Sequence, residues 1–444
     1  MDMTKGTPWK NITRFSIPLI FGNIMQQFYT LADAMIVGKV LGYKALAALG
    51  SADWLAWFMT SIINGITMGY CTKAAQEKGR QSKDGLFSVS AMCIFLSILL
   101  SILLFAVGQA VAMPALKILD TPSDIITDAY HYLRIIYLGI PLNLFYNTFS
   151  ALLRADGDSK TPFIAMVVSS ITNVVLDALF VLVCGWGVTS AAIATVLAQG
   201  VSTYICLMRI LRNENLRFTK DYLTPNGSVL ASILRYSLPM TFQFCVVATS
   251  GLFIQYLTNR QGSTFIAGYT AANKYYGMME MGAIALAAAL LTYTGQNYGA
   301  GNAKRIKQGI SASLCVSAVI SGFVTLLTIL FHKPLLSLFI SADPGTYEEI
   351  FHYATQFLFF LGCPLYILYL HHTFRSILQG MGDVMTPIFS GLMQFAFRVS
   401  SAFIITYLVG PVGIFAAEPF AWTGSVIYLS LRLIYRIRHN QITS

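Results

Sequence analysis

Charged residues are scarce in this sequence. Only 11% of its 444 residues are Asp, Glu, Lys or Arg, whereas 56% are hydrophobic. A soluble domain carries about 25% charged residues, so the composition excludes an ordinary soluble protein and predicts a surface that mostly faces lipid. Acidic residues are fewer than basic ones, with 19 Asp and Glu against 29 Lys and Arg. This balance does not indicate nucleic acid, and we expect no nucleic-acid partner, because membrane proteins gather Lys and Arg in cytoplasmic loops.

Metal, disulfide and catalytic patterns are missing as well. The seven cysteines lie mostly inside apolar runs without CxxC or Cys/His spacing, and we interpret them as small buried hydrophobic residues. The beginning of the chain, MDMTKGTPWKNITRF, lacks a small-residue cleavage site and is not expected to be a removable signal peptide. The sequence offers no nucleophile–base pair or metal cluster, so it predicts neither an enzyme nor a cofactor.

Long apolar runs are abundant. An even number of spans would place both termini on one side of the membrane. One set of loops holds most of the Lys and Arg, so the positive-inside rule predicts cytoplasmic termini in the cell inner or plasma membrane. Twelve runs reach about the 20 residues that a helix needs to cross a bilayer, and they are residues 12–37, 46–70, 86–112, 125–152, 161–184, 187–212, 233–257, 266–294, 308–331, 347–378, 384–408 and 411–436.

The two halves of the chain resemble each other. The polar stretch 213–232 is typical of a linker, and it predicts an N-lobe of residues 1–222 and a C-lobe of residues 223–444. Three pairs of segments align between the halves: LLRADGDSKTPF (152–163) with ILQGMGDVMTPI (377–388), FSIPLIFGN (15–23) with YSLPMTFQF (236–244), and LGIPL (138–142) with LGCPL (361–365).

This repeat predicts the architecture. Each half has six segments, so both halves insert in the same orientation. We expect an all-α membrane protein with twelve transmembrane helices in two six-helix lobes, related by a pseudo-two-fold along the membrane normal, with a substrate path between the lobes. Pro18, Pro141, Pro239 and Pro364 are expected inside helices, where the missing N–H permits bending.

Four polar residues of the first half fall at a similar depth. Asp33 lies about one turn from the outer end of the first run, and Asp177 about two turns from the end of the fifth. Asn173 is one turn deeper than Asp177 on the same face, and Thr195 lies about two turns into the sixth run. An ionised Asp at a helix centre costs about 2.5–3.5 kcal/mol on insertion scales. Such an acid can bind a proton or a small cation, so we predict a transport role for Asp33 and Asp177.

Ordinary helix packing is the alternative for these polar groups. Thr195 by itself is better explained by packing, and Asn173 fits either explanation. Together the two acids, the amide oxygen and the hydroxyl form an all-oxygen set that suits a hard cation such as Na⁺ and equally suits proton exchange. Arg134 could neutralise one of the acids, which would weaken this interpretation.

The membrane segments of the second half carry different charges. Lys274, Glu280, Arg398 and Glu418 are two of each sign, and mutual pairing explains them more simply than substrate contact. His371 and His372 have no third ligand nearby and are interpreted as structural. Asp53 is either a rim residue or a third acid of the cavity. The residues that we expect to line a cavity or contact substrate are Gln26, Tyr29, Asp53, Asn143, Lys274 and Arg398.

Several segments resemble the multidrug and toxic compound extrusion (MATE) transporters. The resemblance spans essentially the whole chain and is carried by IPLIFGNIMQQFYTLADAMIVGKVLG, ALLRADGDSKTPF, NVVLDALF with SAAIATVLAQG, and YTGQNYGAGNAKRIKQG. It implies export of amphipathic, often cationic compounds against an inward flow of H⁺ or Na⁺. The family's first-lobe cation site matches Asp33, Asn173, Asp177 and Thr195, which would be metal ligands only if Na⁺ is the coupling ion.

One branch of that family places acids in segments seven and ten. The interiors of both segments lack Asp and Glu here, so the chain is more similar to the branch that couples through the first lobe. We expect antiport by alternating access in a monomer whose partners are small organic substrates and membrane lipids. The alternative is a flippase for a lipid-linked precursor, which would need a strongly basic cavity, whereas only Arg134, Lys274 and Arg398 are available.

Overall fold

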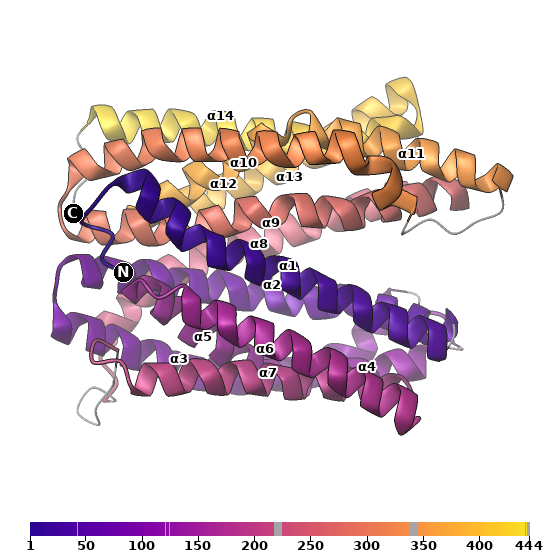
Figure 1. The fold of residues 1–444 in the computed structure, drawn as a ribbon, viewed down its shortest axis with the longest axis horizontal. Coiled ribbons are helices and arrows are strands. Elements are labelled where there is room, and N and C mark those ends of the chain that lie inside the picture. Colours follow the sequence, from indigo (N-terminus) through magenta and orange to yellow (C-terminus); the bar gives the residue numbers. More distant parts are fainter. Residues whose placement is uncertain are drawn as a thin grey trace. The chain divides into compact units, whose positions relative to one another are not determined.

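The regular structure is entirely helical in the part of the chain that is described (Figure 1). The computed structural model describes residues 1–41, 43–119, 121–123, 125–216, 224–337, 344–439 and 441. The first half contains α1 (Pro8–Val40), α2 (Tyr43–Gly79), α3 (Lys83–Ile118), α4 (Ile126–Leu138), α5 (Ile140–Asp156), α6 (Lys160–Asp177), the π-helix η1 (Ala178–Val183) and α7 (Val188–Leu211). The second half contains α8 (Gly227–Asn259), α9 (Ser263–Gly299), α10 (Ala303–Ser337), α11 (Pro344–Gly362), α12 (Leu365–Gly380), α13 (Met385–Val409), the 3-10 helix η3 (Pro411–Ala416) and α14 (Ala417–Arg438).

These helices account for the twelve predicted spans. Among the described residues, eight helical segments are long and apolar enough to cross a membrane, and two bent helix pairs raise the number to ten. Helices α1 and α2 have 33 and 37 residues, which at 1.5 Å per residue gives about 50 Å or more, enough to cross a bilayer. Most of these helices extend beyond the predicted apolar run at one end or both, because the flanking polar residues continue the helix, whereas α7 lies within its predicted run of 187–212.

The two bent pairs occupy equivalent places in the two halves. Helices α4 and α5 meet at 43°, and the α11 and α12 helices meet at 47°. The prolines of the aligned LGIPL and LGCPL segments explain both bends. Pro141 is the second residue of α5 and Pro364 caps α12, so the missing N–H falls next to a break between helices. The prediction that these prolines lie inside helices therefore holds for Pro18, Pro239 and Pro141, the last in the first turn of α5, and is wrong for Pro364.

The chain packs as two units that exchange their first helical turns. One unit consists of residues 1–2 and 21–241, and the other of residues 3–20 and 242–444. The predicted boundary, between residues 222 and 223, lies outside the described residues. Helix α1 therefore begins in the second unit and continues in the first, and α8 does the reverse. Pro18 and Pro239 lie just before the two points of exchange.

Side-chain packing explains the exchange. Ile12, Phe15 and Leu19 at the beginning of α1 are buried in the hydrophobic core of the second unit. In the first unit, the Ser237 hydroxyl of α8 donates to the Ile66 carbonyl at 3.0 Å. Gly65 permits this close approach, since a Cβ there would lie only 2.4 Å from the Thr241 Cα.

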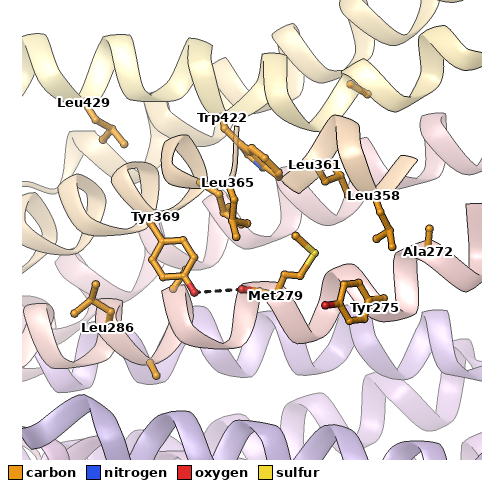
Figure 2. Packing of buried hydrophobic residues seen from close by; sticks show 14 of the residues in the cluster. Ala272, Tyr275, Met279, Leu286, Leu358, Leu361, Leu365, Tyr369, Trp422 and Leu429 are labelled. Atoms are coloured by element: carbon orange, nitrogen blue, oxygen red, sulfur yellow. Dashed lines mark hydrogen bonds between the residues drawn. The ribbon is translucent and has the colours of Figure 1, made fainter. Parts of the chain in front are cut away.

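The core of the second unit is an aromatic and aliphatic cluster between α9, α11, α12 and α14. Figure 2 shows Met279 of α9 facing Leu365 and Tyr369 of α12, with Trp422 of α14 nearby. The Tyr369 hydroxyl satisfies its hydrogen-bonding need by donating to the Met279 carbonyl at 3.3 Å. This packing fixes α9 against α12.

Equivalent helices of the two units make equivalent polar contacts. Ser97 of α3 and Thr148 of α5 share a buried hydrogen bond of 2.8 Å. Ser317 of α10 and Thr373 of α12 share one of 2.9 Å. The hydroxyls join the third membrane segment to the bent fourth segment in each half, so the sequence repeat is also a repeat of tertiary contacts.

The aligned Gly-Asp motifs form the clearest pair. Asp158 Oδ1 accepts from the backbone N–H groups of Lys160 and Thr161 at 3.1 and 3.0 Å, and Arg209 Nε of α7 donates to Oδ2 at 3.1 Å. The carboxylate thus satisfies the free N–H groups at the beginning of α6 and attaches α7 to that helix end.

Asp383 does the same for α13 and α14. Its Oδ1 accepts from the N–H groups of Met385 and Thr386, both at 3.2 Å, and Arg432 Nε donates to Oδ2 at 2.7 Å. Burial alone would raise the pKa of Asp383, but the hydrogen bond and charge of Arg432 and the charge of Arg436 outweigh it and lower the pKa from its ordinary value of 3.8.

Substitution of Asp383 by Asn should therefore destabilise the protein in a pH-dependent way. Hydrogen bonds to charged groups contribute about 1.5–3 kcal/mol each, so we expect a lower apparent Tm for Asp383→Asn in detergent at pH 7. Because the folded-state pKa is depressed, this stabilisation is present above pH 3.8 and disappears as the pH falls through the lower folded-state value. Melting curves at pH 7 and pH 3 should show the difference from wild type shrinking at low pH; a difference independent of pH would contradict the assignment.

Candidate functional site

Asp177 lies at a change of helix type in the first unit. It is the last residue of α6, it is fully buried, and the π-helix η1 begins at the next residue. A π-turn inserts an extra residue into the turn and redirects the following side chains, and such turns are frequent at functional sites. Asn173, with 1% of its surface exposed, lies one turn earlier on the same face.

Helix α7 brings Thr195 to this face. The Asn173 Nδ2 donates to the Thr195 Oγ1 at 3.3 Å. A second contact, from the Ser169 hydroxyl to the Ala198 carbonyl at 2.7 Å, holds the two helices together one turn away. The Asn173 amide nitrogen is used by Thr195, whereas its carbonyl oxygen has no hydrogen-bond donor within the described residues.

Asp33 of α1 completes the cluster. Its side chain is half-buried and interacts electrostatically with Asp177 and with the exposed Asp53 of α2. Two tyrosines, Tyr29 and Tyr132, also lie within electrostatic range of both Asp33 and Asp177. The structure therefore brings together the four residues selected by depth. The sequence did not single out Tyr132, because an aromatic residue in a membrane helix carries no distinctive signal.

The acceptor oxygens of this cluster are unsatisfied. Within the described part of the chain, Asp33 Oδ1, Asn173 Oδ1 and both carboxylate oxygens of Asp177 are buried without a hydrogen-bond donor. Buried polar groups without partners cost free energy, and an unpaired charge costs most. A proton or a small cation bound between these oxygens would remove that cost.

Arg134 does not neutralise the acids. It is exposed, its Nε donates to Gln109 Oε1 at 2.9 Å, and its guanidinium lies 5.5 Å from the centre of the Tyr130 ring. Within the described residues, the structure records no ion pair to Asp33 or Asp177. We refer to Asp33, Asn173, Asp177 and Thr195 as the acid cluster.

The other first-half candidates lie around α1, α2 and α5. Gln26 is exposed, and Tyr29 and Asn143 are half-buried. The Asn143 Oδ1 accepts a hydrogen bond from Asn147 Nδ2 at 2.8 Å. These side chains can supply hydrogen bonds or an aromatic face to a ligand, but they do not form part of the acid cluster.

The charges of the second half pair only in part as predicted. Arg398 Nη2 of α13 donates to Glu418 Oε1 of α14. Glu280 does not pair with Lys274, whose side chain is exposed and has no ion pair within the described residues. The partner of Glu280 is His372, whose Nε2 lies 3.2 Å from Glu280 Oε1. Arg375 Nη2 in turn contacts His372 Nδ1 at 3.0 Å. The sequence could not reveal this contact, because α9 and α12 are brought together only by folding.

The sequence and the fold both match known membrane transporters. The MatE family profile matches residues 18–179 and 239–413. The probable multidrug resistance protein YoeA of Bacillus subtilis is 27% identical over 97% of this chain and 94% of its own length. The probable multidrug resistance protein YpnP of the same organism is 30% identical over 77% of this chain and 76% of its own. The protein in a crystal structure of MATE in complex with MaL6 is 23% identical in sequence to this chain. The two structures superimpose with a TM-score of 0.92 over 99% of this chain and 98% of the other.

The fold and the family match thus define a multi-pass membrane transporter. The chain belongs to the MatE family, whose members are transporters and not enzymes. The predicted fold class is confirmed: the chain is an all-α membrane protein with twelve transmembrane helices in two six-helix lobes.

An Asp177→Asn variant should fold at least as well as the wild type. The substitution keeps the size of the side chain and removes a charge that has no donor within the described residues, so no stabilising contact is lost. Asp158→Asn, which removes a hydrogen-bonded and ion-paired carboxylate, is the matched control and should lower the Tm. Thermal melts in detergent at pH 8 test both variants, and a loss in Asp177→Asn equal to that in Asp158→Asn would reveal a structural role for Asp177.

Proposed function

We propose that this protein is a secondary active multidrug exporter that couples export of amphipathic, often cationic organic compounds to the inward flow of H⁺ or Na⁺. The observation that carries the proposal is the acid cluster, where four buried acceptor oxygens lack a donor within the described residues. Asp33 and Asp177 are the coupling carboxylates, and Asn173 and Thr195 supply the remaining oxygens. A group that needs a cation but has no permanent one can be filled and emptied during a transport cycle.

Transport proceeds by alternating access. The substrate binds from the cytoplasm, and a cation entering the acid cluster from outside favours its release. By thermodynamic linkage, the cation weakens substrate binding by the same free energy by which the substrate weakens cation binding. Helix α1 connects the two events, because it carries Asp33 and contains Pro18 close to the point where the helix passes from one packing unit to the other.

The energy of the gradients sets the stoichiometry. One proton moving down a gradient of one pH unit releases about 1.4 kcal/mol, and one charge moving through 100 mV releases about 2.3 kcal/mol. If one monovalent cation leaves for each proton that enters, the voltage terms cancel and a gradient of about tenfold remains. Two acids allow two protons per cycle, which restores the contribution of the voltage.

The orientation follows from the distribution of charge. We place both termini in the cytoplasm and the protein in the cell inner or plasma membrane, since the loops on the side of the termini hold most Lys and Arg. The acid cluster then lies in the outer half of the membrane. We further propose that the protein acts as a monomer without a resident cofactor.

Substrate contacts come from the remaining polar candidates of the two units. Gln26, Tyr29, Asp53 and Asn143 offer hydrogen bonds, an aromatic ring and a negative charge, which suit a planar cation. Lys274 is exposed and can contact an anionic group of a substrate. The relatives named as multidrug resistance proteins support this substrate class, and they do not favour a lipid flippase.

Transport in proteoliposomes tests the coupling residues. Asp33→Asn and Asp177→Asn should each slow gradient-driven efflux of an ethidium-like cation by more than about tenfold, equivalent to 1.4 kcal/mol, because the neutral amide cannot exchange a proton or balance Na⁺. Imposing the H⁺ and Na⁺ gradients separately identifies the coupling ion.

Arg134→Gln is the control for these variants. It alters an exposed arginine that is hydrogen-bonded to Gln109 and should transport like the wild type. Wild-type efflux in Asp33→Asn would remove the basis of the proposal, and unchanged drug efflux with lost lipid translocation would favour a flippase.

A further inference from the structure

The repeat allows the two units to be compared position by position. Asp158 and Asp383 cap equivalent helices, α6 and α13, with the same backbone contacts. Counting fifteen residues onward from each capping carboxylate reaches Asn173 in α6 and Arg398 in α13. Arg398 therefore occupies the position in the second unit that Asn173 occupies in the acid cluster.

A second pair of markers aligns the next helices. Gly187 precedes α7 with φ 77° and ψ −162°, and Gly410 precedes η3 and α14 with φ 82° and ψ −163°. This unusual backbone conformation is accessible mainly to glycine. Eight residues after each glycine stand Thr195 and Glu418. Glu418 is therefore the counterpart of Thr195.

The counterparts also touch each other. Asn173 donates to Thr195 in the first unit, and Arg398 donates to Glu418 in the second. Two independent markers on two different helices thus converge on one contact. A salt bridge unrelated to the repeat could lie at any pair of positions, but this one lies at the two positions that match Asn173 and Thr195.

The two acids themselves have apolar counterparts. Ala402 stands four residues after Arg398, as Asp177 stands four after Asn173, and Ala402 is fully buried. The alignment of FSIPLIFGN with YSLPMTFQF places the buried Ile254 opposite Asp33. At the matched positions the second unit therefore carries apolar residues in place of the acids and a fixed cation with its own carboxylate.

We propose that the second unit retains the counterpart of the cation site and that the Arg398 guanidinium fills it permanently as a tethered cation. The inference rests on the proposed function of the acid cluster. Around the guanidinium, Glu418 supplies the carboxylate, the Ser250 hydroxyl accepts at 2.9 Å and the Val247 carbonyl lies at 3.5 Å. These are all oxygen acceptors, as a guanidinium requires.

The surroundings are suited to a cation. The side chains of Arg398 and Glu418 are only 16% and 14% exposed. Tyr269, Tyr276 and Glu280 of α9 lie within electrostatic range of the guanidinium. A charge bound covalently to the helix cannot leave, so this site takes up no cation from solution, and ion coupling is confined to the first unit.

Removal of the arginine side chain should create a vacant site for a free guanidinium ion. Purified Arg398→Ala should melt at a lower temperature than wild type, and millimolar guanidinium chloride should restore at least half of the lost Tm, whereas NaCl at equal ionic strength should not. Arg398→Ala/Glu418→Gln, which lacks the carboxylate, and Arg134→Ala, which removes an exposed arginine, should show no restoration. Absence of restoration in Arg398→Ala, or equal restoration in the double variant, would overturn the proposal.

A second variant tests the equivalence if Arg398→Ala does not fold. Arg398→Asn/Glu418→Thr installs the polar pair of the first unit at the matched positions, and its Tm should stay close to that of the wild type. A Tm loss of this variant as large as that of Arg398→Ala, or failure of the variant to fold, would show that the positions are not equivalent. These melts involve no transport, so their outcome is separate from that of the efflux assays on the acid cluster.

Discussion

A carboxylate buried without a permanent cationic partner is the constraint on which the rest of this structure depends. Asp177 has no exposed surface, and neither of its oxygens has a donor within the described residues. Charge in a medium of low dielectric constant is costly, and it persists only if a counter-charge or a proton arrives. The proposed exporter uses this cost: the group is stable when filled and unstable when empty, so its occupancy can be linked to the position of the helices around it.

The surrounding fold keeps the acids available. Helix α6 is held at its beginning by Asp158 and along its length by contacts with α7, so Asp177 and Asn173 stay in place. The π-helical turn after Asp177 interrupts the regular helix at that point. Arg134 is kept away by Gln109. The rigid elements therefore carry Asn173, Asp177 and Thr195, whereas Asp33 belongs to α1, a proline-containing helix shared by two packing units.

The duplicated scaffold carries different side chains in its two copies. Each unit has an equivalent capping aspartate, an equivalent hydrogen bond between two hydroxyls and an equivalent bent pair of helices. At the positions of the acid cluster, however, the second unit carries Arg398, Glu418 and apolar residues. The repeated contacts maintain the architecture of each unit, and in our proposal the side chains at a few positions determine which copy exchanges a cation.

Sequence reasoning could recover the parts that depend on local patterns. Apolar runs predicted the spans, and the depth of Asp33, Asn173, Asp177 and Thr195 within those runs selected a set that lies together in the folded chain. It could not recover the contact of Glu280 with His372, the separation of Arg134 from the acids, or the exchange of the first turns of α1 and α8. These features depend on which helix faces cover one another, which apolar composition alone does not encode.

Infrared difference spectroscopy of the purified protein tests the central claim most directly. The difference between the spectra at pH 5 and pH 8, or between the spectra of Na⁺-free and Na⁺-loaded samples, reports the carboxyl groups that change their protonation or their bound cation. The account predicts a carboxyl signal that is present in the wild type and missing in Asp177→Asn. Identical spectra for the two proteins under both conditions would show that Asp177 exchanges neither a proton nor a cation, and this would contradict the account.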